Sequence, residues 1–88
     1  MQDIQKRQED ILTYIEDCTA EHQCPPTIRE IQAECGIAST STVHSDLKDL
    51  EETGFIKHIG MRYAPVYTER YINKIGKAIE MLAKGTIN

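Results

Sequence analysis

The chain has 88 residues and a mass of 10.0 kDa, which leaves room for one small domain and is too little for a multidomain enzyme. Its composition, 40% hydrophobic and 27% charged, excludes a disordered or fibrous protein. The net charge of −4 is uneven: residues 1–54 carry four Lys and Arg against twelve Asp and Glu, and residues 55–88 carry six against two. Because the C-terminal third is basic, the acidic total does not exclude a nucleic-acid partner.

Hydropathy and cysteine content bear on the compartment. No apolar run approaches the roughly 18 residues that a membrane span needs, and the first residues lack the apolar block of a signal peptide. The cysteines at positions 18, 24 and 35 are odd in number and irregularly spaced, which favours free thiols over a disulfide framework. We therefore expect a cytoplasmic protein that does not associate with membranes.

Two helices are expected in the first part of the chain. Apolar side chains recur at helical spacing between Gln8 and His22, and Cys24-Pro25-Pro26 ends this helix because proline removes a backbone donor. Thr27 and Glu30 have the spacing of a capping box, which predicts a second helix of about two turns that runs into Gly36. The apolar positions of the two helices are Ile11, Ile15, Cys18, Ile28, Ile31 and Cys35.

A third helix follows a hydroxyl-rich stretch, residues 39–42. Val43, Leu47 and Leu50 are spaced by four and three residues and give this helix an apolar face, and Gly54 ends it. Two short helices joined by a turn that contains glycine, the second opened by small hydroxylic residues, form the sequence outline of a helix-turn-helix.

A hairpin is expected next. Residues 54–59 and 63–67 have the composition of two strands around the turn Gly60-Met61-Arg62. Pro65 cannot donate to a sheet ladder, so the second strand should lie at an edge. The predicted fold is therefore mainly α with a small β-hairpin wing: a winged helix-turn-helix followed by a C-terminal amphipathic helix.

The C-terminal helix is expected from 69 to 84, with Thr68 as its cap. Its apolar residues fall on one broad stripe, and Arg70 lies on the opposite, polar face. We divide the chain into a winged helix-turn-helix domain, residues 1–68, and a dimerisation segment, residues 69–88, because one such domain reads only a half-site. In the alternative, this helix folds back onto its own domain. The residues expected between two subunits are Ile72, Ile75, Ile79 and Leu82.

Three segments carry a family resemblance. Pro25–Ile31, Gly36–Ser39 and Ser41–His44 resemble the N-terminal DNA-binding domain of LexA, the SOS repressor, most closely that of the Gram-positive type. The resemblance runs without gaps from about Lys6 to Ile56. It implies a winged helix-turn-helix whose third helix enters the major groove of double-stranded DNA while the wing lies along the backbone. By the same resemblance, the base-contacting positions are Ser39, Ser41, Thr42, His44 and Ser45.

The sequence departs from LexA beyond the third helix. LexA carries, after a linker, a self-cleaving peptidase domain that also dimerises it, and here the amphipathic segment 69–84 stands in its place. We therefore expect neither autoproteolysis nor induction triggered by cleavage. The hairpin from Met61 to Tyr67 also differs from the family pattern.

Basic side chains and helix starts are the candidates for contacts with the DNA backbone. If Val43 and Leu47 face the core, helical geometry puts Ser41, Ser45 and Lys48 on the opposite side of the third helix. The expected phosphate contacts are Thr27, Arg29, Lys48, Lys57, His58 and Arg62, with Arg7 as a further candidate.

No catalytic or metal site is expected. Ser41, His44 and Asp46 contain the groups of a catalytic triad, but helical geometry points Ser41 and Asp46 in different directions. The thiol and imidazole side chains of the first half lack the short paired spacing of zinc ligands. We therefore expect no catalytic residue, no metal and no cofactor. The four side chains excluded as zinc ligands are Cys18, His22, Cys24 and Cys35.

The resemblance and these features together predict a sequence-specific transcriptional regulator, a dimeric repressor that binds a palindromic operator through helix 39–53. The alternative is a protein-binding adaptor or antirepressor that uses its acidic face against a basic partner. Carboxylates on or beside the third helix leave this alternative open, because they would repel phosphate. They are Asp46, Asp49, Glu51 and Glu52.

Overall fold

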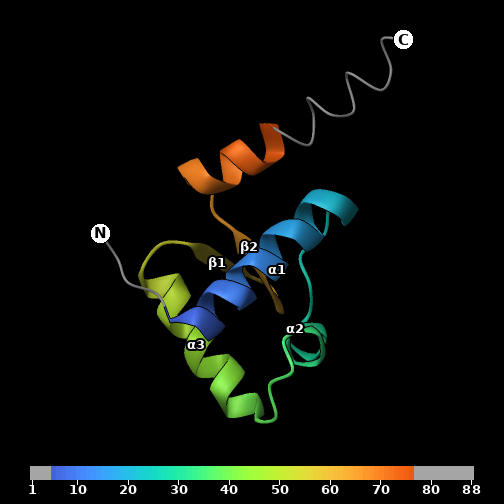
Figure 1. The fold of residues 1–88 in the computed structure, drawn as a ribbon, viewed down its shortest axis with the longest axis vertical. Coiled ribbons are helices and arrows are strands. Elements are labelled where there is room, and N and C mark those ends of the chain that lie inside the picture. The colour runs from blue at the N-terminus through green and yellow to red at the C-terminus, as the bar shows by residue number, and fades with distance from the viewer. Residues whose placement is uncertain (1–4, 77–88) are drawn as a thin grey trace.

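The computed structural model describes residues 5–76 of the chain. Within this range, three helices precede a two-stranded hairpin, and a further helix begins at residue 69 and continues to residue 76 (Figure 1). This order confirms the predicted winged helix-turn-helix and the start of its C-terminal helix; the part of that helix expected at 77–84 lies outside the described residues. The elements that carry labels are α1 (Lys6–His22), α2 (Ile28–Glu34), α3 (Thr40–Glu52), β1 (Ile56–Ile59) and β2 (Arg62–Pro65).

The hydrophobic core joins all three labelled helices to the hairpin. Most apolar positions predicted from helical spacing on α1, α2 and α3 are buried, and Ile56 of β1 completes the cluster. Cys18, Ile28 and Cys35 are only half-buried. Burial of each large aliphatic side chain contributes about 1.5–3 kcal/mol, so the core fixes the angle between α2 and α3. Its members are Ile11, Leu12, Ile15, Ile31, Val43, Leu47, Leu50 and Ile56.

The first helix begins two residues earlier than its apolar pattern. Lys6 and Asp10, one turn apart, form an exposed ion pair with a distance of 3.0 Å between Nζ and Oδ1. The first turn of α1 is therefore polar, and its start cannot be predicted from the spacing of apolar residues. At the other end, Gln23 adopts the left-handed conformation with φ +57°, and its amide donates to the carbonyl of Thr19 at 2.8 Å. This bond caps α1 and turns the chain toward α2.

The hairpin is tighter than the sequence indicated. Ile59 pairs with Arg62, so Gly60 and Met61 alone form the turn, and Gly60 takes φ +60° as such a turn requires. Arg62, placed in the turn by its sequence neighbours, instead opens β2. The second strand ends at Pro65, which pairs with Ile56 at an edge, as expected for a residue without a backbone donor.

The helix at 69–76 docks on α1 with a polar side. Its cap is confirmed: the amide of Tyr71 donates to the hydroxyl of Thr68 at 3.3 Å. Arg70 and Lys74 both reach the carboxylate of Glu16, which is 1% exposed, through nitrogen atoms 2.9 and 3.2 Å from Oε1. Arg70 therefore faces α1 rather than solvent, because the buried carboxylate requires cationic partners.

The apolar stripe of this helix is divided between the domain and solvent. Tyr71 is buried, Ile75 is half-buried and Ile72 is 53% exposed. Figure 1 shows α1 between this helix on one side and α2 and α3 on the other. Two residues of the expected dimer seam, Ile79 and Leu82, lie outside the described residues. Among residues 5–76, no helix has both the length and the apolar character needed to cross a membrane.

Candidate nucleic-acid interface

The start of α2 is held by the capping box that the sequence predicted. The amide of Glu30 donates to the Thr27 hydroxyl at 3.2 Å, and the amide of Thr27 donates to the Glu30 carboxylate at 2.8 Å. These hydrogen bonds, with the backbone amide of Thr27 first among them, lower the pKa of Glu30. Thr27 is half-buried at the helix start, and Arg29, the second residue of α2, is exposed.

The turn between α2 and α3 is compact. Gly36 takes φ +64°, a conformation that side chains with a Cβ atom disfavour, and nothing lies within 4 Å of a Cβ placed there. The amide of Ile37 then donates to the carbonyl of Gln32 at 3.1 Å. These features turn the chain within a few residues and bring the start of α3 beside α2.

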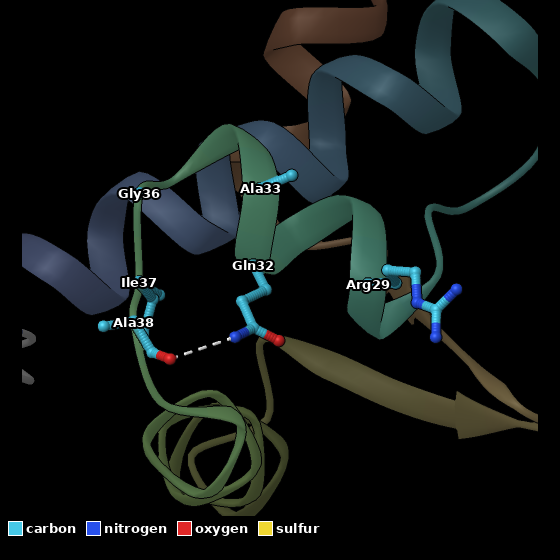
Figure 2. Close-up of a pocket in the computed structure, with 6 residues that line it drawn as sticks. All are labelled: Arg29, Gln32, Ala33, Gly36, Ile37 and Ala38. Atoms are coloured by element: carbon cyan, nitrogen blue, oxygen red, sulfur yellow. Dashed lines mark hydrogen bonds between the residues drawn. The ribbon is translucent and has the colours of Figure 1, made fainter.

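The Gln32 side chain fastens this turn from the α2 side. Its Nε2 donates to the carbonyl of Ala38 at 3.3 Å, and its Oε1 accepts from the Thr40 hydroxyl at 3.1 Å. Figure 2 shows the amide reaching across the turn to Ala38, while Arg29 points away from it. One side chain thus uses both its donor and its acceptor to hold the first turn of α3. The open hollow around this contact is lined by Arg29, Gln32, Ala33, Gly36, Ile37 and Ala38.

Sequence reasoning did not single out Gln32. A polar residue after a buried isoleucine in α2 has no period or motif that marks it. Its signal was available only as a pair: an amide eight residues before a hydroxyl, across a turn that contains glycine. Such a pair becomes meaningful once the turn geometry is known.

The outward face of α3 carries the side chains for which the resemblance implied base contacts. Ser39, Ser41, His44 and Ser45 are exposed, whereas Thr42 is half-buried. Ser39 is the N-cap residue, and its hydroxyl lies 2.9 Å from that of Ser41. Lys48 continues the same exposed face one turn farther on. The structure therefore brings these groups together as a surface of hydroxyls, one imidazole and one cation.

Asp46 does not belong to that surface. It is 2% exposed, and its carboxylate accepts hydrogen bonds from Arg7 and from Gln8, whose Nε2 lies 3.2 Å from Oδ1. The Arg7 guanidinium is the main cause that lowers the pKa of Asp46. The expectation that Asp46 would repel phosphate is wrong, because the carboxylate is buried and its charge is neutralised. Arg7 in turn is engaged with Asp46 rather than free.

The other three carboxylates of α3 are exposed. Asp49, Glu51 and Glu52 lie in the second half of the helix, and Gln8 donates to Asp49 at 3.1 Å. Up to Lys48, the exposed side chains of α3 therefore include hydroxyl, imidazole and ammonium groups, and from Asp49 to the end of the helix they are acidic. This polarity limits the part of α3 that suits a phosphate-rich partner. The burial of Asp46 removes one of the four carboxylates on which the adaptor alternative depended.

The hairpin presents cations and an apolar tip. Lys57 and His58 are exposed, and the His58 ring stacks on Tyr63 with centroids 4.5 Å apart. Met61 at the turn is 89% exposed. Arg62 is half-buried, and its Nη1 donates to the carbonyl of Pro25, so this guanidinium joins the hairpin to the loop between α1 and α2.

The groups considered for catalysis and metal binding are placed differently. The Asp46 carboxylate is paired with Arg7, so it does not complete a catalytic triad with Ser41 and His44. Cys18 and Cys35 are half-buried and Cys24 is exposed, all as free thiols. Across residues 5–76, no group of three or more His, Cys, Asp or Glu side chains could hold a metal ion.

Comparison with known proteins places this surface in a family context. The family model of the LexA DNA binding domain matches residues 1–62. The LexA repressors of Shouchella clausii (strain KSM-K16) and Bacillus mycoides (strain KBAB4) are each 47% identical to the chain over 57 residues. The matched part is 65% of this chain and 27% and 28% of those repressors, so the chain spans little more than a quarter of their length.

A solved structure supports the fold alone. The crystal structure of a hypothetical protein at 2.2 Å resolution aligns with 98% of this chain and 27% of its own, with a TM-score of 0.66 and 22% sequence identity. At that identity the likeness extends to the arrangement of helices and hairpin and no further.

Proposed function

Because the chain belongs to the LexA DNA-binding domain family, we propose that it is a repressor that binds double-stranded DNA in a sequence-specific way. The observation that carries this proposal is the exposed face of α3 before Asp49, which carries Ser41, His44 and Lys48. The core and the Gln32 contacts hold that face in a fixed orientation. A rigid helix presented by a helix-turn-helix is the geometry that enters the major groove.

Base recognition is assigned to the start of α3. Hydroxyl groups both donate and accept, so they pair with either kind of base-edge group, and an imidazole can reach a purine acceptor. The methyl group of Thr42 suits a thymine methyl. The proposed base contacts are Ser39, Ser41, Thr42, His44 and Ser45.

Backbone contacts are assigned to the flanking elements. Lys48 on α3, Arg29 on α2 and Lys57 on β1 are exposed cations. Arg62 has one nitrogen on Pro25, and its other N–H groups remain suited to phosphate. The proposed backbone contacts are Thr27, Arg29, Lys48, Lys57, His58 and Arg62.

The small number of cations sets the expected strength of binding. With about four phosphates neutralised per subunit, log K falls with log salt at a slope of about −4, or about −7 for two subunits. The carboxylates at the end of α3 make this salt dependence shallower still. Affinity is therefore expected to depend on base contacts and on two subunits acting together.

Two copies of the chain are proposed to dimerise through segment 69–88 and to bind a palindromic operator together. The docking of helix 69–76 by Arg70 and Lys74 supports this, because it leaves Ile72 facing away from the domain at 53% exposure. The proposed seam is Ile72, Ile75, Ile79 and Leu82. Two-fold symmetry would then match two half-sites about one helical turn apart.

Selection from a random duplex library tests the proposed function. We expect enrichment of an inverted repeat by the wild-type chain. His44→Ala and Ser45→Ala should abolish enrichment of that repeat, whereas Glu21→Gln, an exposed site at the end of α1, should retain it. Failure of the folded wild-type chain to enrich any sequence would refute the proposal.

A further inference from the structure

Two free thiols and a guanidinium meet where α1 ends. Cys18 is half-buried on α1, and Cys24 is exposed just after the helix. The Cys18 Sγ lies 3.7 Å from the carbonyl oxygen of Cys24, and Nη1 of Arg62 lies 3.2 Å from the Cys24 Sγ. The last turns of α1, the loop and β2 therefore bring both thiols and a positive charge to one place.

The backbone at the end of α1 explains why the thiols meet. Gln23 takes φ +57°, and its amide donates to the carbonyl of Thr19. This is the pattern of a helix C-cap in which the capping residue has the left-handed conformation. This cap folds the chain back over the last turns, so the residue after it packs against one near the helix end. Here those two residues are Cys24 and Cys18. The Cys18 thiol therefore lies against the backbone of Cys24, at the end of the helix and outside the hydrophobic core cluster.

The two thiols have different environments. Burial raises the pKa of the Cys18 thiol, so it is protonated near neutral pH. Cys24 is open to solvent and in contact with Arg62. When a thiolate attacks a peroxide, negative charge develops on the departing oxygen, and a neighbouring guanidinium stabilises it. Cys24 is thus the sulfur that an oxidant meets first.

We propose that Cys18 and Cys24 form a thiol pair that hydrogen peroxide oxidises to a disulfide. The Cys24 thiolate attacks one peroxide oxygen, the O–O bond breaks, and hydroxide leaves and takes up the proton that the Cys24 thiol released. Cys24 is then a sulfenic acid. Cys18 attacks the sulfenic sulfur, the S–O bond breaks, its proton leaves with the hydroxyl group as water, and the S–S bond forms. Two thiols are oxidised and one peroxide is reduced to two water molecules.

Cys35 is the internal control. It lies at the end of α2, half-buried and packed against the hydrophobic core, and burial raises its pKa as well. It therefore shares the chemistry of a thiol but not the exposed, cation-bearing position of Cys24. The proposal requires that Cys35 stay reduced while the other two thiols react.

Peptide mapping tests the proposal. Trypsin cleaves after Arg7, Arg29 and Lys48, so one peptide, 8–29, contains Cys18 and Cys24, and another, 30–48, contains Cys35. The full chain is treated with hydrogen peroxide in native buffer, alkylated and digested. We expect the mass of peptide 8–29 to be lower than that of its reduced form by two hydrogen atoms, and its cysteines to resist alkylation. Peptide 30–48 should be fully alkylated. This readout uses the wild-type chain and needs no variant to fold.

Variants separate the roles of the residues, with circular dichroism as a check of folding. Cys18→Ser should stop at a Cys24 sulfenic acid that dimedone traps, and Cys35→Ser should form the disulfide at the wild-type rate. Arg62→Gln should form it about threefold more slowly or worse. Three results overturn the proposal: no oxidation of peptide 8–29, a bond that involves Cys35 or a second copy of the chain, or an unchanged rate in Arg62→Gln.

Discussion

Asp46 of α3 and Arg7 of α1 form an ion pair on the side of α3 opposite to Ser41, His44 and Lys48. The Arg7 Nη2 lies 3.0 Å from Oδ1 of Asp46 and the Arg7 Nε contacts Oδ2, so the pair is bidentate. Only 3% of the Asp46 side chain is exposed, against 47% of that of Arg7. A surface cation of the first helix therefore neutralises a buried carboxylate of the third.

Arg7→Ala should destabilise the fold. The substitution leaves the Asp46 carboxylate with Gln8 as its remaining partner, and a buried charge without its counter-ion costs about 1–3 kcal/mol when water can partly reach it. Urea unfolding measures the loss. Lys6→Ala is the matched control, because its ion pair with Asp10 is exposed and is worth less than about 1 kcal/mol. Equal losses in the two variants would show that the Arg7 pair has no special weight.

The same pair predicts a dependence of stability on pH. Arg7 lowers the pKa of Asp46 below its ordinary value of 3.8, so the ionised carboxylate stabilises the folded state above that value. This contribution is lost as the pH falls through the lowered pKa. We expect the free energy of unfolding of the wild type to decline below about pH 4, and that of Asp46→Asn to decline less steeply. Parallel curves for the two proteins would assign the acid sensitivity to other carboxylates, Glu30 first among them.

Gln32 should affect DNA discrimination more than stability. Gln32→Ala removes two neutral hydrogen bonds at the start of α3, each worth about 0.5–1.5 kcal/mol. Because these bonds fix the first turn of α3, we expect the ratio of specific to scrambled-duplex affinity to fall about tenfold. Competition binding with both duplexes measures this ratio. Thr40→Ser retains the hydroxyl and should behave as wild type, whereas Thr40→Val should resemble Gln32→Ala. If Thr40→Val discriminates between the duplexes as well as Thr40→Ser, the Gln32 hydrogen bonds have no role in DNA discrimination.

The elements of the fold could be predicted from local pattern. Apolar spacing located the faces of α1 and α3, and the Thr27–Glu30 capping box located the start of α2. These signals are short in range: each involves residues within one or two helical turns. The outward placement of Ser41, Ser45 and Lys48 followed from the same spacing.

Polar contacts between distant segments could not be predicted. Asp46 is 39 residues from Arg7, and Glu16 is 54 from Arg70, so no periodic pattern links the members of either pair. As a result, Asp46 was expected on the surface and Arg70 on a solvent face, although each is part of a pair that holds two helices together. A charged residue looks the same in the sequence whether it is exposed to solvent or buried in an ion pair. Only the packing of the folded chain distinguishes the two cases.

The dimer seam predicts a change in mass in solution. Ile72→Asp combined with Ile79→Asp puts two charges on the proposed apolar seam, and we expect a folded monomer where the wild type is a dimer. Light scattering after size-exclusion chromatography measures the mass. Asn73→Asp adds a charge at an exposed position of the same helix and should remain dimeric. A wild-type monomer, or a double variant that is still a dimer, would reject this seam.

The central claim, that the first half of α3 contacts DNA, is tested most directly by NMR. Amide shifts of the isotope-labelled chain are followed as the duplex enriched from the random library is added, with a scrambled duplex as control. We expect the largest shifts at Ser41, His44 and Ser45, with smaller ones at Lys57. Shifts confined to the acidic second half of α3 and to α1, or the same shifts with either duplex, would contradict the claim.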